Sequence, residues 1–380
     1  MTGIYRKQVL VLFFLFACLL AINQIIRFIP GINYPSTTIY KIFVAISVAA
    51  LVAYSFGETR FTYVDCLFIL FAVYIVIENL INGNSIVNAV LASSWCIAFV
   101  AGNRVSRHGD ENSLIGLKTI LFVITIVVAT YAMYVNYTGN IYARTNIIAV
   151  NYIIYFGLPI FLYASINNKR RLETIIMVLW IVLTILSFKR TTLVALATGL
   201  VAYIYFKYLK SRKAKDILRF FVIVFLLFAA AIYINNVTDG YIVTRLLIAQ
   251  ETGGNGRTEI WTDVFALIRE KSFWGIMFGS GYNAVEAVYG ISAHNEILET
   301  LFDYGIIGLM FLVAAYFVII AKAVKAKREG AANAAVYIFT VVVMAIISFF
   351  SHIQLYTYVG IPVFFFFGTL YGMKNKRTLS

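Results

Sequence analysis

The chain is a succession of apolar runs, and many of them reach the roughly 20 residues that an α-helix needs to cross a bilayer. Hydrophobic residues make up 62% of its 380 residues and charged residues only 13%, about half the charge of a typical soluble domain. Inside hydrocarbon every backbone polar group must find a partner within the protein, so such runs fold as helices. We therefore predict an all-α, polytopic transmembrane helical bundle.

The apolar runs predict about twelve spans within a single integral membrane domain that covers residues 1–380. The spans are expected at residues 9–29, 40–56, 63–81, 86–102, 114–135, 147–166, 172–187, 191–208, 217–235, 296–320, 333–351 and 355–372. The first run is too long for a signal-peptide core and lacks a small-residue cleavage site, so we expect it to be retained as a span.

Basic residues predict the orientation of these spans. Lys and Arg number 31 against 17 Asp and Glu, but most of the surplus sits in short clusters between apolar runs, which is typical of orientation signals and not of a nucleic-acid surface. Seven clusters fall on one side of the twelve-span scheme, which is therefore predicted to be cytoplasmic with both termini inside. They are Arg6/Lys7, Arg60, Arg104/Arg107, Lys169/Arg170/Arg171, Lys210/Arg212/Lys213/Lys215, Lys322/Lys325/Lys327/Arg328 and Lys374/Lys376/Arg377.

On the opposite side, residues 236–293 form the one long loop. Within it, residues 257–273 are predicted to form an amphipathic helix, with apolar side chains at helical spacing. The apolar positions are Ile260, Trp261, Val264, Phe265 and Ile268, and the polar ones are Glu259, Asp263 and Arg269. Trp261, Phe273 and Trp274 suit a helix at the level of the lipid headgroups.

Two arginines in these outer segments are candidate anion ligands. Lys189 and Arg190 lie in the tight link between two spans, where a planar guanidinium can bind phosphate oxygens, although the pair can equally anchor the hairpin by snorkelling. Arg257 follows the Gly-rich segment 253–256 at a predicted helix N-terminus, which favours anions, but an ordinary capped surface helix also fits.

His294 opens a polar segment that runs into the span 296–320. On a helical wheel Glu296, Glu299 and Asp303 share one face, and this acidic stripe predicts a hydrophilic cavity that opens outward. Ser292 is a candidate N-cap, and a neutral imidazole beside it can accept a proton from a hydroxyl group. An interfacial polar histidine is the alternative.

The three cysteines have no metal-binding or disulfide spacing, and neither a metal nor a cofactor is predicted.

The pattern at this helix start resembles a known signature. His294-Asn295 is followed by two leucines, Leu298 and Leu301, then by the Gly-x-x-Gly-Leu run at residues 305–309 and by an aromatic residue at 311. It is similar to the motif of the O-antigen ligase and Wzy-type polysaccharide polymerase superfamily, and the resemblance extends from about residue 187 to residue 311.

The resemblance implies a metal-independent membrane glycosyltransferase of the GT-C kind in the bacterial plasma (inner) membrane. Its substrate would be a polyprenyl-diphosphate-linked oligosaccharide at the outer face of the bilayer. In the superfamily a Ser-Arg pair in the link between two spans supplies a functional arginine. Arg190 matches this arginine, whereas Lys189 stands where the family has serine. Members of the superfamily also have an arginine followed by Trp at similar spacing, and Arg257 matches that arginine. His294 is then the predicted base or acceptor-orienting group, with Glu296 and Glu299 as further catalytic candidates.

We predict a repeat-unit polymerase for capsule, exopolysaccharide or O-antigen, because polymerases vary most in sequence and make up most of the superfamily. A ligase that moves glycan to a lipid or wall acceptor is the alternative, since both activities use the same donor. A chain-length regulator is a possible partner. A flippase or other transporter is a third reading, but the chain has only four prolines and one long outer loop without a counterpart.

Overall fold

The computed structural model describes six continuous ranges, 61–108, 171–186, 190–208, 256–331, 333–351 and 357–372, together with isolated residues elsewhere. The elements in these ranges are α-helices. They are α3 (Tyr63–Ile81), α4 (Ile86–His108), α9 (Arg171–Leu186), α10 (Arg190–Tyr208), α13 (Arg257–Glu270), α14 (Phe273–Phe278), α15 (Ala284–Tyr289), α16 (Glu296–Arg328), α17 (Ala334–Phe350) and α18 (Thr357–Gly372). The spans predicted at 9–29, 40–56, 114–135, 147–166 and 217–235 lie outside the described ranges.

Seven predicted spans fall wholly or largely within the described ranges, and each overlaps a helix. The prediction 63–81 matches α3 at both ends, whereas α4 continues to His108 instead of ending at 102. By length and apolar composition, three of the described helices can cross a membrane: Tyr63–Ile81, Ile86–Arg107 and Glu296–Arg328. Shorter apolar helices lie at Thr191–Lys207, Ala334–Phe350 and Val363–Gly372, and the structure does not test the total of twelve.

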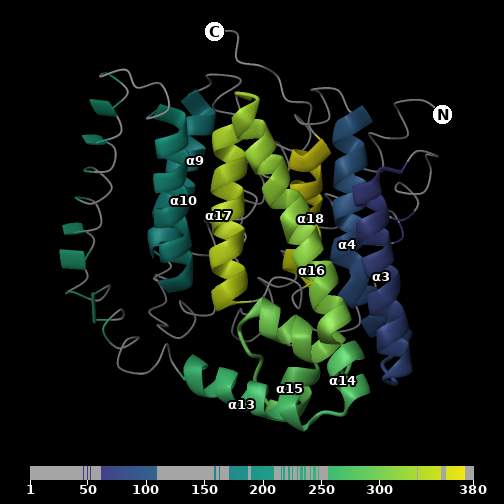
Figure 1. Ribbon diagram of the computed structural model, residues 1–380. Coiled ribbons are helices and arrows are strands. Elements are labelled where there is room, and N and C mark those ends of the chain that lie inside the picture. Colours follow the sequence, from purple (N-terminus) through teal and green to yellow (C-terminus); the bar gives the residue numbers. More distant parts are fainter. Residues whose placement is uncertain are drawn as a thin grey trace.

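The long helices stand side by side as a bundle (Figure 1). α3 packs on α4, α4 on α18, α10 on α17, and α16 on both α3 and α17. Glycines permit the closest of these contacts. A Cβ atom added to Gly102 of α4 would lie 2.0 Å from the carbonyl oxygen of Phe365, and one added to Gly368 of α18 would lie 2.0 Å from that of Phe99. Any larger residue would force α4 and α18 apart.

Basic side chains gather at one end of the bundle. The ammonium group of Lys322 lies 5.3 Å from the ring centroid of Tyr371, whose hydroxyl is 3.3 Å from that of Tyr63. Arg107 Nη2 donates to Asp65 Oδ2 at 2.5 Å, which ties α4 to the start of α3. These contacts place the Arg104/Arg107 cluster and the cluster that begins at Lys322 on one side, here called the basic end. Which face of the membrane it meets stays a prediction.

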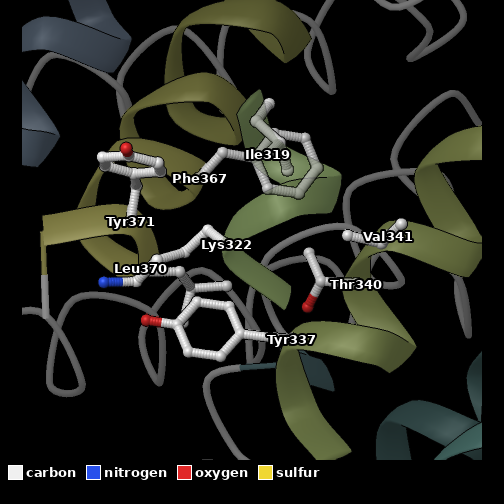
Figure 2. Close-up of a pocket in the computed structure, with 8 residues that line it drawn as sticks. All are labelled: Ile319, Lys322, Tyr337, Thr340, Val341, Phe367, Leu370 and Tyr371. Atoms are coloured by element: carbon white, nitrogen blue, oxygen red, sulfur yellow. The ribbon is translucent and has the colours of Figure 1, made fainter. Parts of the chain in front are cut away.

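A small cavity lies between α16, α17 and α18 near this basic end (Figure 2). Its lining is mostly apolar, with Lys322 and the phenol of Tyr337 among its side chains. It is therefore separated by the length of the bundle from the residues predicted to carry chemistry.

The opposite end carries a layer of short helices, which we call the capping layer and define as residues 256–304. Figure 1 shows α13, α14 and α15 lying across that end of the bundle. The layer has a small apolar core of its own, separate from the main core of the bundle. Its buried members are Val264, Ala284, Val285, Ala293, Leu298 and Phe302.

α13 confirms most of the predicted amphipathic helix. It ends at Glu270, before Phe273. Val264 is fully buried, and Ile260, Trp261 and Ile268 pack against the core of the layer. Phe265 was expected on the same face, but it is 51% exposed, and Leu267 packs inward instead.

The prediction of one continuous span over 296–320 is wrong, because α16 breaks at Gly305, where φ is 64° and ψ is −168°. A straight helix would separate Glu296 from Tyr316 by about 30 Å, yet Tyr316 donates a hydrogen bond to the Glu296 carboxyl group. The first nine residues of α16 therefore turn back over the end of the bundle and form part of the capping layer. A Cβ atom at Gly305 would lie 2.4 Å from the carbonyl oxygen of Met277, so only glycine fits this turn.

Candidate functional site

The half-buried His294 precedes α16 and lies outside the helix, in the left-handed region with φ at 51°. This conformation is uncommon for a residue with a side chain and marks a constrained turn. The predicted cap at Ser292 is wrong: Asn295 is the N-cap, and its side-chain oxygen accepts from the amides of Ile297 and Leu298 at 3.0 Å each. Ser292 contacts the imidazole instead, with its Oγ 3.4 Å from His294 Nδ1.

Glu299 stabilises the turn that carries His294. Its carboxyl group accepts a hydrogen bond from the amide of Ala293 and lies within reach of the amide of His294. Glu299 itself is only 3% exposed. The Glu299 carboxyl group thus stabilises the backbone of Ala293 and His294, from which the imidazole projects.

Glu296 is buried as well, at 1% exposure. Its carboxyl group accepts from the hydroxyl of Tyr316, and that hydroxyl lies 2.9 Å from Ser348 Oγ on α17. This chain of contacts joins the start of α16 to its own membrane-spanning part and to a second helix. It fixes the capping layer to the bundle directly beneath the His294 turn.

Asp303, at 1% exposure, is also enclosed by protein. Its carboxyl oxygens accept from the amides of Asn283 at 2.9 Å, Ala284 at 3.0 Å and Val285 at 3.4 Å, and so they cap the start of α15. The acidic stripe predicted to line an open cavity is therefore buried, because its three carboxyl groups are engaged by backbone amides and a tyrosine hydroxyl.

Lys271, between α13 and α14, supplies a cation next to Asp303. Its ammonium group donates to the carbonyl oxygen of Phe302 at 2.7 Å and lies 3.4 Å from the centroid of the Phe302 ring. Burial lowers the pKa of Lys271 to about 8, although the nearby carboxyl groups of Asp303 and Glu78 act in the opposite direction. Desolvation outweighs attraction at this position.

Arg257 is the first residue of α13, which begins after Gly256 in a left-handed conformation. One turn later on the same helical face, Trp261 Nε1 donates to the carbonyl oxygen of Ala293 at 2.7 Å. Because Ala293 precedes His294 directly, this bond places the start of α13 beside the histidine turn. The start of α13, a helix N-terminus that begins with an arginine, therefore lies near the histidine turn, and a helix N-terminus favours an anion.

Arg190 is the first residue of α10, and its neighbour Lys189 lies outside the described ranges. α10 runs antiparallel to α17, and a Cβ atom at Gly199 would lie 2.7 Å from the side chain of Val343. Counting along the two helices from that contact brings Arg190 within about one helical turn of the level of Phe350. The structure thus places Arg190, Arg257 and His294 at the same end of the bundle.

The site combines a half-buried imidazole, a helix N-terminus and two arginine-bearing helix starts. Among the residues that the structure describes, no three His, Cys, Asp or Glu side chains gather closely enough to hold a metal ion. Guanidinium groups and backbone amides can stabilise negative charge that develops on a leaving group. An imidazole can accept the proton of an attacking hydroxyl.

Sequence reasoning missed the residues that support the site. Tyr316 and Ser348 carry no local signal, because a straight helix would hold Tyr316 far from Glu296. Asn295 did carry one: asparagine is among the preferred N-cap residues, and it directly precedes the first helical residue.

Comparison with known families finds a match, and the matched stretch contains the candidate site. The family model described as O-antigen ligase matches residues 175–313, which include most of α9, all of α10, the capping layer and the residues of α16 that follow Gly305 up to 313. The match confirms the resemblance to the O-antigen ligase and Wzy-type polymerase superfamily over that stretch. No curated protein matches the chain.

Proposed function

We propose that the protein polymerises polyprenyl-diphosphate-linked oligosaccharide repeat units at the outer face of the plasma membrane. The family match supports an integral membrane protein with an O-antigen ligase or polymerase type of function in general. The observation that carries the proposed chemistry, which a polymerase and a ligase share, is the hydrogen bond from Trp261 to Ala293. It brings the arginine at the start of α13 next to the histidine turn, within the matched segment.

In the proposed reaction a hydroxyl oxygen of the acceptor sugar attacks the anomeric carbon of the donor. The bond from that carbon to the lipid diphosphate breaks, and the diphosphate leaves with the bonding electron pair. The hydroxyl proton passes to the imidazole of His294. Arg190 and Arg257, with Lys189, bind the diphosphate and stabilise the charge that it gains.

In this proposal Glu296 and Glu299 position His294, and neither carboxyl group acts as the base. Both are almost fully buried, and both carboxyl groups accept hydrogen bonds from within the protein. The conservative change Glu299→Gln keeps an acceptor for the Ala293 amide, so we expect near-normal turnover. Glu299→Ala removes the acceptor and should lower kcat by roughly tenfold or more. A base would be lost equally in both variants.

A transfer assay with the protein in nanodiscs and a lipid-linked repeat unit tests the main proposal. Replacing His294, Arg190 or Arg257 by Ala should slow transfer by on the order of a hundredfold. Arg269→Ala is the matched control, because Arg269 is exposed in the last turn of the same helix as Arg257 and should keep wild-type activity. Full activity in all three site variants would defeat the proposal.

A ligase is the second candidate, because the matching family model carries that description. The surface glycan of cells with His294→Ala separates the two activities on a gel. Single-repeat products at normal protein level indicate a polymerase. Full-length polymer that accumulates on the lipid carrier indicates a ligase.

A further inference from the structure

Three aromatic side chains meet where α17 ends against the capping layer. The ring centroid of Phe349 lies 5.5 Å from that of Trp261, and it lies 4.9 Å from that of Phe350, both in edge-to-face geometry. Phe349 is 45% exposed and Phe350 37% exposed. We call Trp261, Phe349 and Phe350 the aromatic edge.

The aromatic edge is joined directly to the histidine turn. Trp261 bonds to the carbonyl oxygen of Ala293, so its ring is fixed in orientation beside His294. On the other side of the same helix end, Ser348 contacts Tyr316, which holds Glu296. The end of α17 thus supports the site with one face and presents two phenylalanines outward with the other.

The position of the aromatic edge restricts which kind of molecule can bind to it. α17 is an apolar helix of the bundle, and Phe349 and Phe350 are its last two residues, at the level where the membrane-embedded part gives way to the capping layer. The exposed surface of the two phenylalanines is apolar, so it suits a hydrocarbon and not a sugar or a phosphate. A ligand whose phosphates lie near Arg190 and Arg257 has to lead its hydrocarbon chain back into the bilayer near this level.

We propose that the aromatic edge binds the isoprenoid chain of the lipid carrier, along the part next to the diphosphate. This inference rests on the proposed function for the identity of the carrier. Alkene and methyl groups of the chain would pack on the faces and edges of Phe349 and Phe350. The edge would thereby set the depth at which the diphosphate meets the arginines.

A second group of exposed aromatics provides a matched control. Phe273 and Trp274 of α14 are each 67% exposed and also belong to the capping layer. α14, however, packs on the other side of that layer: Tyr74 of α3 donates to the carbonyl oxygen of Phe278 at 3.1 Å, and Figure 1 places α14 below α16 and beside the lower end of α3. Bulk lipid can reach both groups, whereas the proposed carrier reaches only the aromatic edge.

The test compares two donors that carry the same oligosaccharide, one on a full-length polyprenyl diphosphate and one on a diphosphate with a single isoprene unit. In nanodiscs, Phe349→Ala/Phe350→Ala should raise KM for the long donor by roughly tenfold and leave KM for the short donor and kcat within about twofold. Phe273→Ala/Trp274→Ala should change neither value. The milder Phe349→Leu/Phe350→Leu, which keeps an apolar surface, should give an intermediate KM.

An equal change for both donors, no change for the long donor, or the same effect in the α14 control would overturn the inference. A sugar-free, photoactivatable polyprenyl diphosphate gives a readout that does not depend on activity. It should label residues 349–350 of the wild-type protein and not residues 273–274, and the opposite pattern would reject the aromatic edge. If the wild type transfers no sugar from either donor, the proposed function fails, and the labelling still decides whether the edge binds the chain.

Discussion

Asp303 offers the sharpest separation of a structural from a catalytic role. Asp303 is the third carboxyl group in the segment that follows His294, and a carboxyl group in that place would suit a catalytic acid or base. The structure instead shows its carboxyl oxygens accepting from the amides of Asn283, Ala284 and Val285. Its removal should therefore loosen the capping layer before it affects the chemistry.

The size of the effect follows from the three bonds. Those from Asn283 and Ala284, at 2.9 and 3.0 Å, are well formed, and the one from Val285, at 3.4 Å, is long. Allowing about 1–1.5 kcal/mol for each of the first two and about 0.5 kcal/mol for the third gives roughly 3 kcal/mol for Asp303→Ala. This corresponds to a factor of about 150 in the folding equilibrium.

Asp303→Asn should cost about half as much. The amide oxygen can still accept from Ala284 and Val285, but the NH₂ group then faces the N–H of Asn283, and that bond is lost. Asp263→Ala is the control, because Asp263 is exposed and accepts only from the Tyr289 hydroxyl among the hydrogen bonds found. It should change stability by no more than about 1 kcal/mol.

Denaturant-induced unfolding of the purified protein in nanodiscs, followed by tryptophan fluorescence, measures these differences. The expected order of stability is wild type and Asp263→Ala, then Asp303→Asn, then Asp303→Ala, with transfer activity retained wherever the protein is folded. If Asp303→Asn keeps wild-type stability and loses turnover, the carboxyl group is catalytic and this reasoning is refuted.

Two further predictions concern the same layer. Gly279→Ala should prevent stable folding, because the added Cβ atom would lie 2.2 Å from the Asp303 carbonyl oxygen at a backbone φ of 98°. The control Gly290→Ala has open space around it and should lower the free energy of unfolding by only about 1–2 kcal/mol. Equal protein levels in the two variants would contradict this prediction. Lys271 has a pKa of about 8 in the folded protein and about 10.4 in the unfolded chain. Between these two pH values the unfolded chain binds more protons than the folded protein, so the free energy of unfolding should rise with pH there. Lys271→Met should flatten that part of the unfolding profile, and parallel profiles for both proteins would reject the assignment.

The sequence predicted the bundle helices well because their signal is local. The polar residues at both ends of an apolar run mark where the helix begins and ends, and α3 has the bounds that were predicted for it, residues 63–81. The grouping of basic residues at one end was predictable for the same reason, since each cluster sits beside its own helix. The histidine motif also supported the family resemblance, and the stretch that the family model matches includes it.

The support of the candidate site could not be read in the same way. In the sequence Gly305 is only the first glycine of the Gly-x-x-Gly-Leu run, and only the close approach of the Met277 carbonyl oxygen shows why a glycine stands where the chain reverses. From that reversal follow the burial of Glu296 and its bond to Tyr316, which lies twenty residues away in the sequence. A helical wheel assumes a straight helix, so it placed the carboxyl groups on an open face.

The amino-acid sequence by itself determined the helical class of the chain, the extent of its apolar helices and the residues that can bind an anion or accept a proton. These are properties of composition and of neighbours within a few turns. Only the tertiary structure decided that Glu299 holds the turn of His294 and that Trp261 brings α13 to it. The hydrogen bond from Trp261 to Ala293 joins positions 32 residues apart in different elements, and the one from Ala293 to Glu299 forms in a turn outside the helix, so no helical periodicity records either contact.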